Sequence, residues 1–385
     1  MTAQVETALS CYVHIPFCVR KCPYCDFYSL PGFPVAESAY VTRLIAELRH
    51  RRQESLHDHR PLRSIFFGGG TPSVLHADSI AAILKALQED WPLEPDCEIT
   101  LEANPESCHP DKIAGWRMAG VNRVSLGIQA LDDARLRQLG RPHDRTAALG
   151  ALDALQRAGI PRINVDLIHG TPDHTLEAWR QELETILRWQ VGHLSCYALT
   201  VEPETPFHRL AEQGRLCLPD EGQALELFRF TRDFLTERGY RGYEISNFAR
   251  PGEACRHNLN YWEFGDYLGI GAGAHGKWSD PVDQSTWRSA NPADIAFYMG
   301  QPFAALREIS RGEAGLECLM MGLRLQQGMS LTRFAQVAGE AFEVSRKERL
   351  ERLTGSGYLE IDEARNRVRV TAEGIQWLDE ILEQL

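Results

Sequence analysis

The sequence predicts an α/β protein whose main part is a partial (β/α)6 barrel, followed by a small helical, winged-helix-like C-terminal domain. Six strand-sized apolar runs alternate with longer amphipathic segments through about two-thirds of the chain, and the tail combines helical patterns with a hairpin pattern. Strands that alternate with helices at this spacing pair in parallel through right-handed crossovers. Six units are too few to close an eight-stranded barrel, so we expect an open one.

The predicted strands are runs rich in β-branched and aromatic residues, at 11–15, 64–67, 98–102, 123–127, 163–168 and 194–199. The predicted helices between them have apolar residues at helical spacing, at 38–52, 78–89, 132–139, 145–158, 176–189 and 221–238. In a parallel sheet built this way, functional side chains gather at the carboxyl ends of the strands. We therefore look for a site in the segments that follow the strands.

The rest of the chain predicts a different organisation. Residues 252–276 are rich in glycine, asparagine and aromatic residues, and residues 279–302 are expected to form loops because they contain three prolines. The tail predicts helices at 313–324, 331–337 and from 346, short strands at 358–361 and 367–370, and a last helix. We expect a barrel core over residues 1–245, a loop-rich segment over 246–305 and a C-terminal domain over 306–385.

The composition is that of a folded protein without a membrane span. The 385 residues are 43% hydrophobic and 24% charged, and the net charge of −12 argues against nucleic-acid binding. The apolar runs are much shorter than the ~20 residues of a membrane helix. The first ten residues lack the basic and apolar regions of a secretory signal, so we expect a cytoplasmic protein. Ten cysteines, seven of them scattered, do not suit a disulfide scaffold in a chain of this length, and Cys11 and Cys196 fit the core of predicted strands.

Three of the cysteines, Cys18, Cys22 and Cys25, lie together just after the first predicted strand. Spacings of four and three residues let three thiolates converge from one loop, as a cubane iron–sulfur cluster requires. Three ligands leave one iron open to bind a cofactor through oxygen and nitrogen. Zinc is the alternative, but structural zinc takes four closed ligands, and no second pair of cysteines follows at the required spacing. His14 is a fourth-ligand alternative, although its place within a strand favours packing or contact with a cofactor.

The CxxxCxxC loop, with an aromatic residue before its last cysteine, resembles the signature of the radical S-adenosylmethionine (SAM) superfamily. That superfamily has a partial (β/α)6 barrel, in agreement with the six units of the sequence. In it, the open iron chelates the amino and carboxylate groups of SAM, and an electron from the reduced cluster cleaves SAM to a 5′-deoxyadenosyl radical. The resemblance implies a [4Fe-4S] cluster on Cys18, Cys22 and Cys25, with SAM as a cofactor.

Further segments at the ends of predicted strands resemble the same superfamily. The Gly-Gly-Gly-Thr-Pro motif at 68–72 lets the backbone approach the methionine part of SAM. The resemblance implies that Asp166 or Glu102 binds the ribose hydroxyls or the amino group, and that Arg141 pairs with a carboxylate. The complete set expected to bind SAM is Tyr12, Tyr24, Gly69, Gly70, Thr71, Glu102, Gln129, Arg141, Asp166 and Ala198. A single such residue would be explained as well by a helix cap or a surface ion pair, but their repetition on successive strands favours a cofactor rim.

Within the superfamily, the chain resembles the oxygen-independent coproporphyrinogen III oxidase group over nearly its whole length. The segments that carry this resemblance are YVHIPFC at 12–18, GGGTP at 68–72 and NVDLIHG at 164–170. The group includes true oxidases and heme chaperones of the HemW type. The oxidases extend the cysteine loop to CxxxCxxCxC and carry a longer N-terminal extension, whereas Phe27 stands here at the place of the fourth cysteine. The HNLNYW motif at 257–262 is similar to the HemW type.

The HNLNYW motif suggests a heme site. Histidine is a common axial ligand of heme iron, and aromatic side chains cover a porphyrin face. The candidates for heme contact are His257, Asn258, Tyr261 and Trp262, with His275 as a second candidate ligand and Cys255 as a less favoured one. The alternative is that His257 and Asn258 tie down an irregular loop while Tyr261 and Trp262 pack in the core.

The resemblance implies a heme chaperone that delivers heme to acceptor proteins, such as respiratory enzymes, by docking at the membrane surface. The expected partners are heme, these acceptors and an electron donor such as a flavodoxin or a ferredoxin, with homodimerisation left open. The alternatives are an oxygen-independent coproporphyrinogen III oxidase, a radical SAM protein for an unrelated substrate, and a zinc-stabilised binding protein. Whether SAM is cleaved, and therefore whether the protein is an enzyme, stays open.

Overall fold

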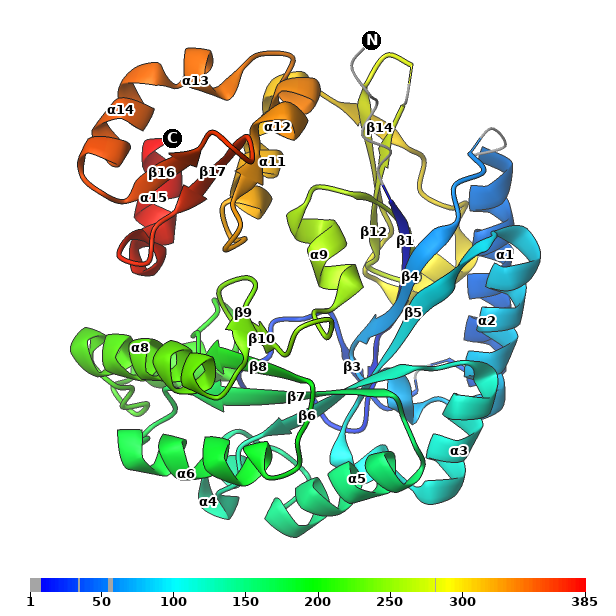
Figure 1. Ribbon diagram of the computed structural model, residues 1–385. Coiled ribbons are helices and arrows are strands. Elements are labelled where there is room, and N and C mark those ends of the chain that lie inside the picture. The colour runs from blue at the N-terminus through cyan, green and yellow to red at the C-terminus, as the bar shows by residue number, and fades with distance from the viewer. Residues whose placement is uncertain (1–7, 34, 55–57, 281) are drawn as a thin grey trace.

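A computed structural model describes residues 8–33, 35–54, 58–280 and 282–385 (Figure 1). Residues 1–7, which make up most of the segment where we expect no secretory signal, lie outside the described residues. Within the described part, one 12-stranded sheet runs in the order β14-β13-β12-β11-β1-β4-β5-β6-β7-β8-β10-β9. Its strands are β1 (Leu9–Ile15), β4 (Leu62–Gly69), β5 (Leu93–Ala103), β6 (Arg123–Gln129), β7 (Arg162–His169), β8 (His193–Ala198), β9 (Arg241–Gly242), β10 (Asn247–Ala249), β11 (Asp266–Ile270), β12 (His275–Ser279), β13 (Thr286–Ala290) and β14 (Arg307–Ile309).

The six predicted strands form the parallel centre of this sheet. β1, β4, β5, β6, β7 and β8 are neighbours in chain order, and every pair among them is parallel. Figure 1 shows them as an open arc with helices on its outer side, which confirms the partial barrel. The helices of this part are α1 (Glu37–Glu54), α2 (Ala77–Asp90), α3 (Pro110–Ala119), α4 (Asp133–Gln138), α5 (Arg145–Arg157), α6 (Leu176–Leu187), α7 (Pro206–Glu212) and α8 (Glu221–Glu237).

The two faces of the arc differ in chemistry. Along β1, Leu9, Cys11 and Val13 belong to the hydrophobic core that the outer helices cover. The alternate residues Ser10 and Tyr12 point the other way, because side chains alternate along a strand. They contact Ser64 and Phe66 of β4 on the concave side of the arc. The convex face is therefore apolar, and the concave face carries the polar side chains available for a site.

The segment 246–305 is more regular than its sequence predicts. β11 pairs in parallel with β1 and extends the arc, and β12, β13 and β14 continue it as antiparallel strands. The prediction of loops over 279–302 is wrong for β13 and for α10 (Ile295–Gly300). Pro292 and Pro302 lie just outside these elements rather than within them, so they mark element ends and not a long loop. The HNLNYW motif forms the short helix α9 (Arg256–Trp262), which lies on the concave side of the arc (Figure 1).

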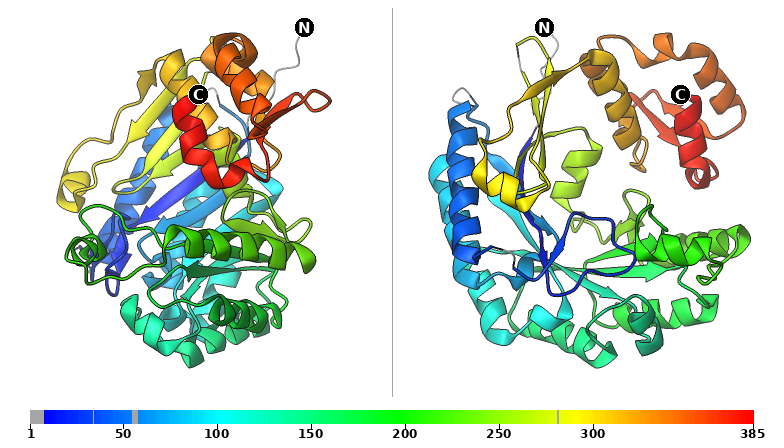
Figure 2. Two further views of the ribbon diagram at one scale, coloured as in Figure 1. Left: turned by 90° about the vertical axis from the view of Figure 1, so that its left-hand side faces the viewer. Right: turned by 180° about the vertical axis from the view of Figure 1, so that it is seen from behind.

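The C-terminal part has its own hydrophobic core, which includes Leu319, Phe334 and Val368. It combines a three-stranded antiparallel sheet with five helices in the described residues, in agreement with the predicted winged-helix-like domain (Figure 2). Its elements are α11 (Arg311–Gly322), β15 (Met329–Ser330), α12 (Leu331–Ala338), α13 (Phe342–Ser345), α14 (Lys347–Gly355), β16 (Leu359–Asp362), β17 (Arg367–Val370) and α15 (Leu378–Gln384). The domain boundaries at 245 and 305 stay a prediction. None of the helices in the described part is both long and apolar enough to cross a bilayer.

Candidate functional site

The cysteine loop crosses the open end of the arc, where the parallel strands end. Figure 2 shows this dark-blue segment in front of the sheet in the right-hand view. Its two ends are clamped by the short parallel strands β2 (Phe17–Cys18) and β3 (Leu30–Pro31). The Leu30 amide donates to the Pro16 carbonyl at 2.6 Å, and the Gly32 amide donates to the Cys18 carbonyl at 2.8 Å. The loop is therefore a closed unit fixed at its base, which holds its three cysteines near one another.

A cleft of about 360 Å³ lies between this loop and the carboxyl ends of the strands. The thiols of Cys18, Cys22 and Cys25 all line it. Among the described residues, no three His, Cys, Asp or Glu side chains come close enough together to hold a single metal ion. Three thiols that line one cleft from a single loop suit a polynuclear cluster, in which each thiolate binds a different iron.

Polar groups around the cleft support the thiols. Thr71 donates from Oγ1 to Cys18 Sγ at 3.3 Å, and Arg141 donates from Nη1 to Cys22 Sγ at 3.5 Å. Burial raises the pKa of the Cys18 and Cys25 thiols. Thiolates at these positions thus need a cation bound directly to sulfur, and iron supplies one. The donor set fits a three-cysteine iron–sulfur cluster.

The glycine motif keeps the cysteine loop close to the end of β4. Gly69 has φ of +111°, and a Cβ built on it would lie 2.5 Å from Cε1 of His14. A Cβ on Gly70 would lie 2.8 Å from the carbonyl oxygen of Phe17 and 3.0 Å from Sγ of Cys18. The Gly70 amide donates to the carbonyl of Ile15 at 2.8 Å. Only glycine fits this contact between backbone segments.

Two carboxylates face the cleft from β5 and β7. Glu102 accepts a hydrogen bond from the Gly69 amide at 3.2 Å, and Asp166 accepts one from Oγ of Ser125 at 2.9 Å. Burial, and then the charge of Asp166, raises the pKa of Glu102 to about 8. Burial also raises the pKa of Asp166. A ligand that brought hydroxyl or ammonium donors into the cleft would stabilise both groups as anions.

The structure brings together most of the residues expected to bind SAM. Nine of the ten line the cleft: Tyr24, Gly69, Gly70, Thr71, Glu102, Gln129, Arg141, Asp166 and Ala198. Gln129 has a left-handed φ of 68° beside a register shift between β6 and β7, which re-aims the chain at the rim. Tyr12 is not among the lining residues. Its hydroxyl lies 3.1 Å from Nδ1 of His14, whose Nε2 lies 3.0 Å from the carbonyl of Tyr28. His14 is thus a packed residue.

The cleft is also lined by residues that the sequence did not single out. These are chiefly Asn104, Ser125, Gly127 and Tyr197. Asn104 donates from Nδ2 to Oγ1 of Thr71 at 3.1 Å and accepts a hydrogen bond from Arg141. It therefore holds together the two residues that donate to the cysteine thiols. Its place after β5, in the same LEANP segment as Glu102, is a signal that could have found it.

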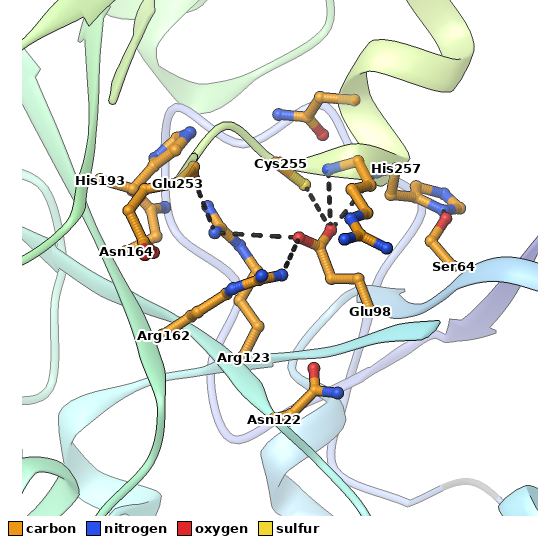
Figure 3. Close-up of polar contacts among 12 residues, drawn as sticks. Ser64, Glu98, Asn122, Arg123, Arg162, Asn164, His193, Glu253, Cys255 and His257 are labelled. Atoms are coloured by element: carbon orange, nitrogen blue, oxygen red, sulfur yellow. Dashed lines mark hydrogen bonds and ion pairs between the residues drawn. The ribbon is translucent and has the colours of Figure 1, made fainter. Parts of the chain in front are cut away.

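The heme candidates do not line the cleft. His275 is exposed at the start of β12, whereas His257 on α9 is 1% exposed. His257 lies against Phe66, with ring centroids 5.0 Å apart. Its Nδ1 is 2.9 Å from Oγ of Ser64, and Figure 3 shows these two side chains next to each other. Ser64 also contacts Oγ of Ser10 at 2.8 Å. Because Nε2 of His257 has no acceptor among the described residues, the tautomer that donates from Nδ1 to Ser64 leaves no buried N–H group of the ring unpaired.

The Nε2 atom of His257 therefore keeps its lone pair, and it has no hydrogen-bond partner among the described residues. Burial lowers the pKa of His257 to about 3, so the ring is neutral. A neutral imidazole with a free Nε2 is the form that ligates metals. In this conformation the imidazole is enclosed between the sheet and α9.

Comparison with known proteins places these features in context. Residues 12–186 match the family model described as the radical SAM superfamily, and residues 309–377 match the HemN C-terminal domain. The chain is 36% identical to the heme chaperone HemW of Haemophilus influenzae, and the match covers 97% of each chain. It is also 36% identical to the heme chaperone HemW of Escherichia coli, again over 97% of each chain.

A mitochondrial relative and a solved structure extend the comparison. The chain is 36% identical to the mitochondrial radical S-adenosyl methionine domain-containing protein 1 of Mus musculus, covering 98% of this chain and 87% of the relative. The structure of coproporphyrinogen III oxidase (HemN) from Escherichia coli superimposes with a TM-score of 0.78 at 24% identity, covering 99% of this chain and 91% of that one. This likeness confirms the fold.

Proposed function

The chain belongs to the radical SAM superfamily and, within it, to the family of HemW-type heme chaperones, and from this premise we propose that it binds heme and passes it to acceptor proteins. The observation that carries the proposal is the neutral imidazole of His257, whose Nε2 has no partner in the described structure. It lies in the HNLNYW helix, between the aromatic rings of Phe66 and Tyr261. His275, which is exposed, is the second candidate ligand.

The proposal includes a [4Fe-4S] cluster and SAM in the cleft. Cys18, Cys22 and Cys25 would hold the cluster, and Thr71 and Arg141 would donate hydrogen bonds to its sulfur ligands. When bound, the cluster supplies an open iron for SAM and an electron. The carboxylates of Glu102 and Asp166 would accept hydrogen bonds from the amino and hydroxyl groups of SAM, since both lie in the same cleft.

The proposed partners follow from the same premise. The acceptors would be respiratory heme proteins reached by docking at the membrane surface, and the cluster would receive its electron from a flavodoxin or a ferredoxin. We place the protein in the cytoplasm, with peripheral contact with the membrane.

Phe27 is 66% exposed on the cysteine loop and lines the cleft, at the place where the oxidases have a further cysteine. This difference favours a chaperone over an oxidase.

Anaerobic reconstitution followed by heme titration tests the proposal. We expect wild-type protein to gain iron and sulfide and to bind heme with a defined stoichiometry in its Soret absorbance. His257→Ala should weaken heme binding at least tenfold and leave the iron content unchanged. Cys22→Ser should abolish the cluster absorbance and leave the protein folded. His275→Ala tests the second candidate ligand, and His109→Ala, at an exposed histidine just before α3, is the matched control.

Two results would contradict the proposal. The first is a lack of heme binding by the wild-type protein, which would leave a radical SAM protein for another substrate. The second is conversion of coproporphyrinogen III to protoporphyrinogen IX by the reduced, reconstituted protein with SAM. That turnover would assign the oxidase activity instead.

A further inference from the structure

A chain of four hydrogen bonds crosses the concave side of the sheet, from the cofactor cleft to α9. Asn258 donates from Nδ2 to the Tyr243 hydroxyl at 3.2 Å, and that hydroxyl lies 3.0 Å from Nε2 of His193. Nδ1 of His193 lies 2.7 Å from Oδ1 of Asn164, and Asn164 donates from Nδ2 to Oδ1 of Asp166 at 2.8 Å. The chain thus links a lining residue of the cleft to the second residue of the HNLNYW motif.

Every bond of this chain points in the same direction. Because Asn164 donates through its amide nitrogen to Asp166, its oxygen faces His193 and must accept from Nδ1. Nε2 of His193 then accepts from the Tyr243 hydroxyl, whose oxygen accepts from Asn258. Burial, and then the charge of Arg123, lowers the pKa of His193, so the ring is neutral and donates on one side only. Hydrogen bonds aligned in this way polarise one another, and here they end on a carboxylate.

The same N-terminal part of α9 has a second anchor. Glu98 is fully buried, and its Oε1 accepts hydrogen bonds from Sγ of Cys255 at 3.3 Å and from the Arg256 amide at 3.0 Å. Arg162 lies 3.6 Å from the other oxygen of Glu98. In Figure 3, Glu98 lies between two groups of side chains: Asn164 and His193 on one side, and Ser64 and His257 on the other. Asn258 thus adds a second contact from the first turn of α9, to Tyr243, and displacement of the helix away from the sheet breaks it.

We infer that His193 is a positioning residue that couples the cofactor cleft to α9, so that a ligand bound at Asp166 alters how firmly α9 is held. A ligand that donates to Asp166 competes with or reinforces the Asn164 bond, and the aligned chain transmits the change to Asn258. Since His257 lies next to Asn258 and is enclosed, its availability to a porphyrin depends on the same contact. The inference rests on the proposed function for the identity of the two ligands, SAM and heme.

Hydrogen exchange of the full-length, cluster-reconstituted protein tests the coupling without heme. Tyr243→Phe removes one hydroxyl from the series of hydrogen bonds and leaves the volume of the core unchanged. His193→Leu removes the imidazole at the centre of that series. Tyr240→Phe is the matched control, because the Tyr240 hydroxyl donates to the Val191 carbonyl and takes no part in this series of hydrogen bonds. We expect saturating SAM to change the exchange rate of the α9 amides at least fivefold in wild type and in Tyr240→Phe. In Tyr243→Phe and His193→Leu, the change should be less than twofold.

The outcomes separate this inference from the proposed function. If SAM binds the wild type without changing α9 exchange, or if Tyr243→Phe responds to SAM as Tyr240→Phe does, the coupling is wrong while the cofactor assignment stands. If SAM does not bind at all, the cofactor assignment and the coupling both fail. Heme titration with and without SAM gives a second readout. We expect the heme dissociation constant of the wild type to shift at least fivefold, and that of Tyr243→Phe less than twofold; equal shifts in both overturn the coupling.

Discussion

The glycine motif shows how a residue acts at the site through the space that it leaves free. The atoms that crowd Gly69 and Gly70 belong to His14, Pro16, Phe17 and Cys18, all from the strand and loop that carry the cysteines. The motif predicts backbone approach to a cofactor, and the structure adds that it permits approach of the cysteine loop to β4. The two roles agree, because the loop must lie near the strand end for its thiols to reach the cleft.

Gly70→Ala should therefore affect the cluster more than the fold. The added Cβ would lie 2.8 Å from the Phe17 carbonyl and 3.0 Å from Sγ of Cys18, so the cysteine loop must shift. We expect at least a fivefold loss of iron after anaerobic reconstitution, with a loss of about 1–3 kcal/mol in the free energy of unfolding. Gly150→Ala in α5 is the control, because nothing lies near its Cβ. It should keep its iron and gain about 0.5–1 kcal/mol of stability. Equal iron contents in the two variants would contradict the steric argument.

Glu102 predicts a dependence of stability on pH. Burial first, and the Asp166 charge second, raise its pKa to about 8 in the folded protein without ligand. A carboxyl group whose pKa is raised on folding stabilises the fold below its unfolded pKa, and this stabilisation is lost as pH rises through the folded value. The wild type should thus lose stability relative to Glu102→Gln between about pH 4.5 and pH 8, by on the order of 2–4 kcal/mol.

Urea unfolding at pH 5, 6.5 and 8 measures this difference. Glu89→Gln, on the exposed side of α2, is the control and should follow the wild type at all three pH values. Parallel curves for wild type and Glu102→Gln would show that Glu102 ionises as an ordinary surface carboxyl.

At the scale of elements, the sequence predicts the strands and helices that have a clear local pattern of apolar residues. The six central strands and most of the helices between them are recovered, because each strand is a compact apolar run and each recovered helix has buried residues at helical spacing. α3 escapes notice because only Ile113 and Trp116 are buried in it, which leaves little helical pattern. The strands β11 to β13 escape because they are short and lie in a segment rich in glycine and proline. Their pairing is a tertiary property that alternation within five residues does not reveal.

In the site, too, local sequence patterns could be read but tertiary contacts could not. Residues carried by motifs, such as Cys18, Thr71 and Asp166, could be predicted because their spacing fixes them at strand ends. Asn104 acts through its contacts with Thr71 and Arg141, and such contacts depend on how loops from different strands meet. The burial of His257 could not be predicted either, since nothing local shows that α9 lies inside the arc.

The added edge of the sheet depends on Asp266 at the start of β11. Its carboxylate accepts from Nζ of Lys277 at 2.7 Å and from Nη1 of Arg60 at 2.8 Å. Burial alone would raise the pKa of Asp266, but Lys277 and Arg60 lower it to about 2. A lowered carboxyl pKa gives stability that is present above the unfolded value and is lost as pH falls through about 2.

Asp266→Asn should thus destabilise the protein by about 3–5 kcal/mol at pH 7, because it leaves buried cations without the shared carboxylate. The difference from wild type should shrink as the pH is lowered from 4 toward 2. Denaturant unfolding at each pH measures it. Asp153→Asn, which removes an exposed partner of Arg157, should change stability by at most about 0.5 kcal/mol. A similarly small effect for Asp266→Asn would mean that the edge strands are held by packing alone.

At the scale of the whole molecule, the C-terminal domain packs beside the open side of the barrel. Its core is separate from the barrel core but includes Phe264, and the partly buried Phe228 and Ile245 pack against it. Polar contacts add to this packing. Arg229 donates to Oε1 of Gln376 at 2.8 Å, and Arg333 donates to the Phe264 carbonyl at 2.9 Å. The domain therefore contacts the segments on both sides of α9.

Arg324 joins this domain to the helix of the HNLNYW motif. Its guanidinium lies 4.7 Å from the ring centroid of Trp262, and its Nη2 donates at 3.4 Å to Oε2 of Glu244, which is 1% exposed. Arg324→Ala should lower the free energy of unfolding by about 1–3 kcal/mol, because it removes the charged partner of a buried carboxylate. It should also speed limited proteolysis between the barrel and the C-terminal domain at least threefold, without loss of iron. Arg365→Ala, in the exposed β16–β17 hairpin, is the control and should leave both measurements unchanged. If Arg324→Ala is cleaved no faster than Arg365→Ala, the apolar contacts alone keep the C-terminal domain in place.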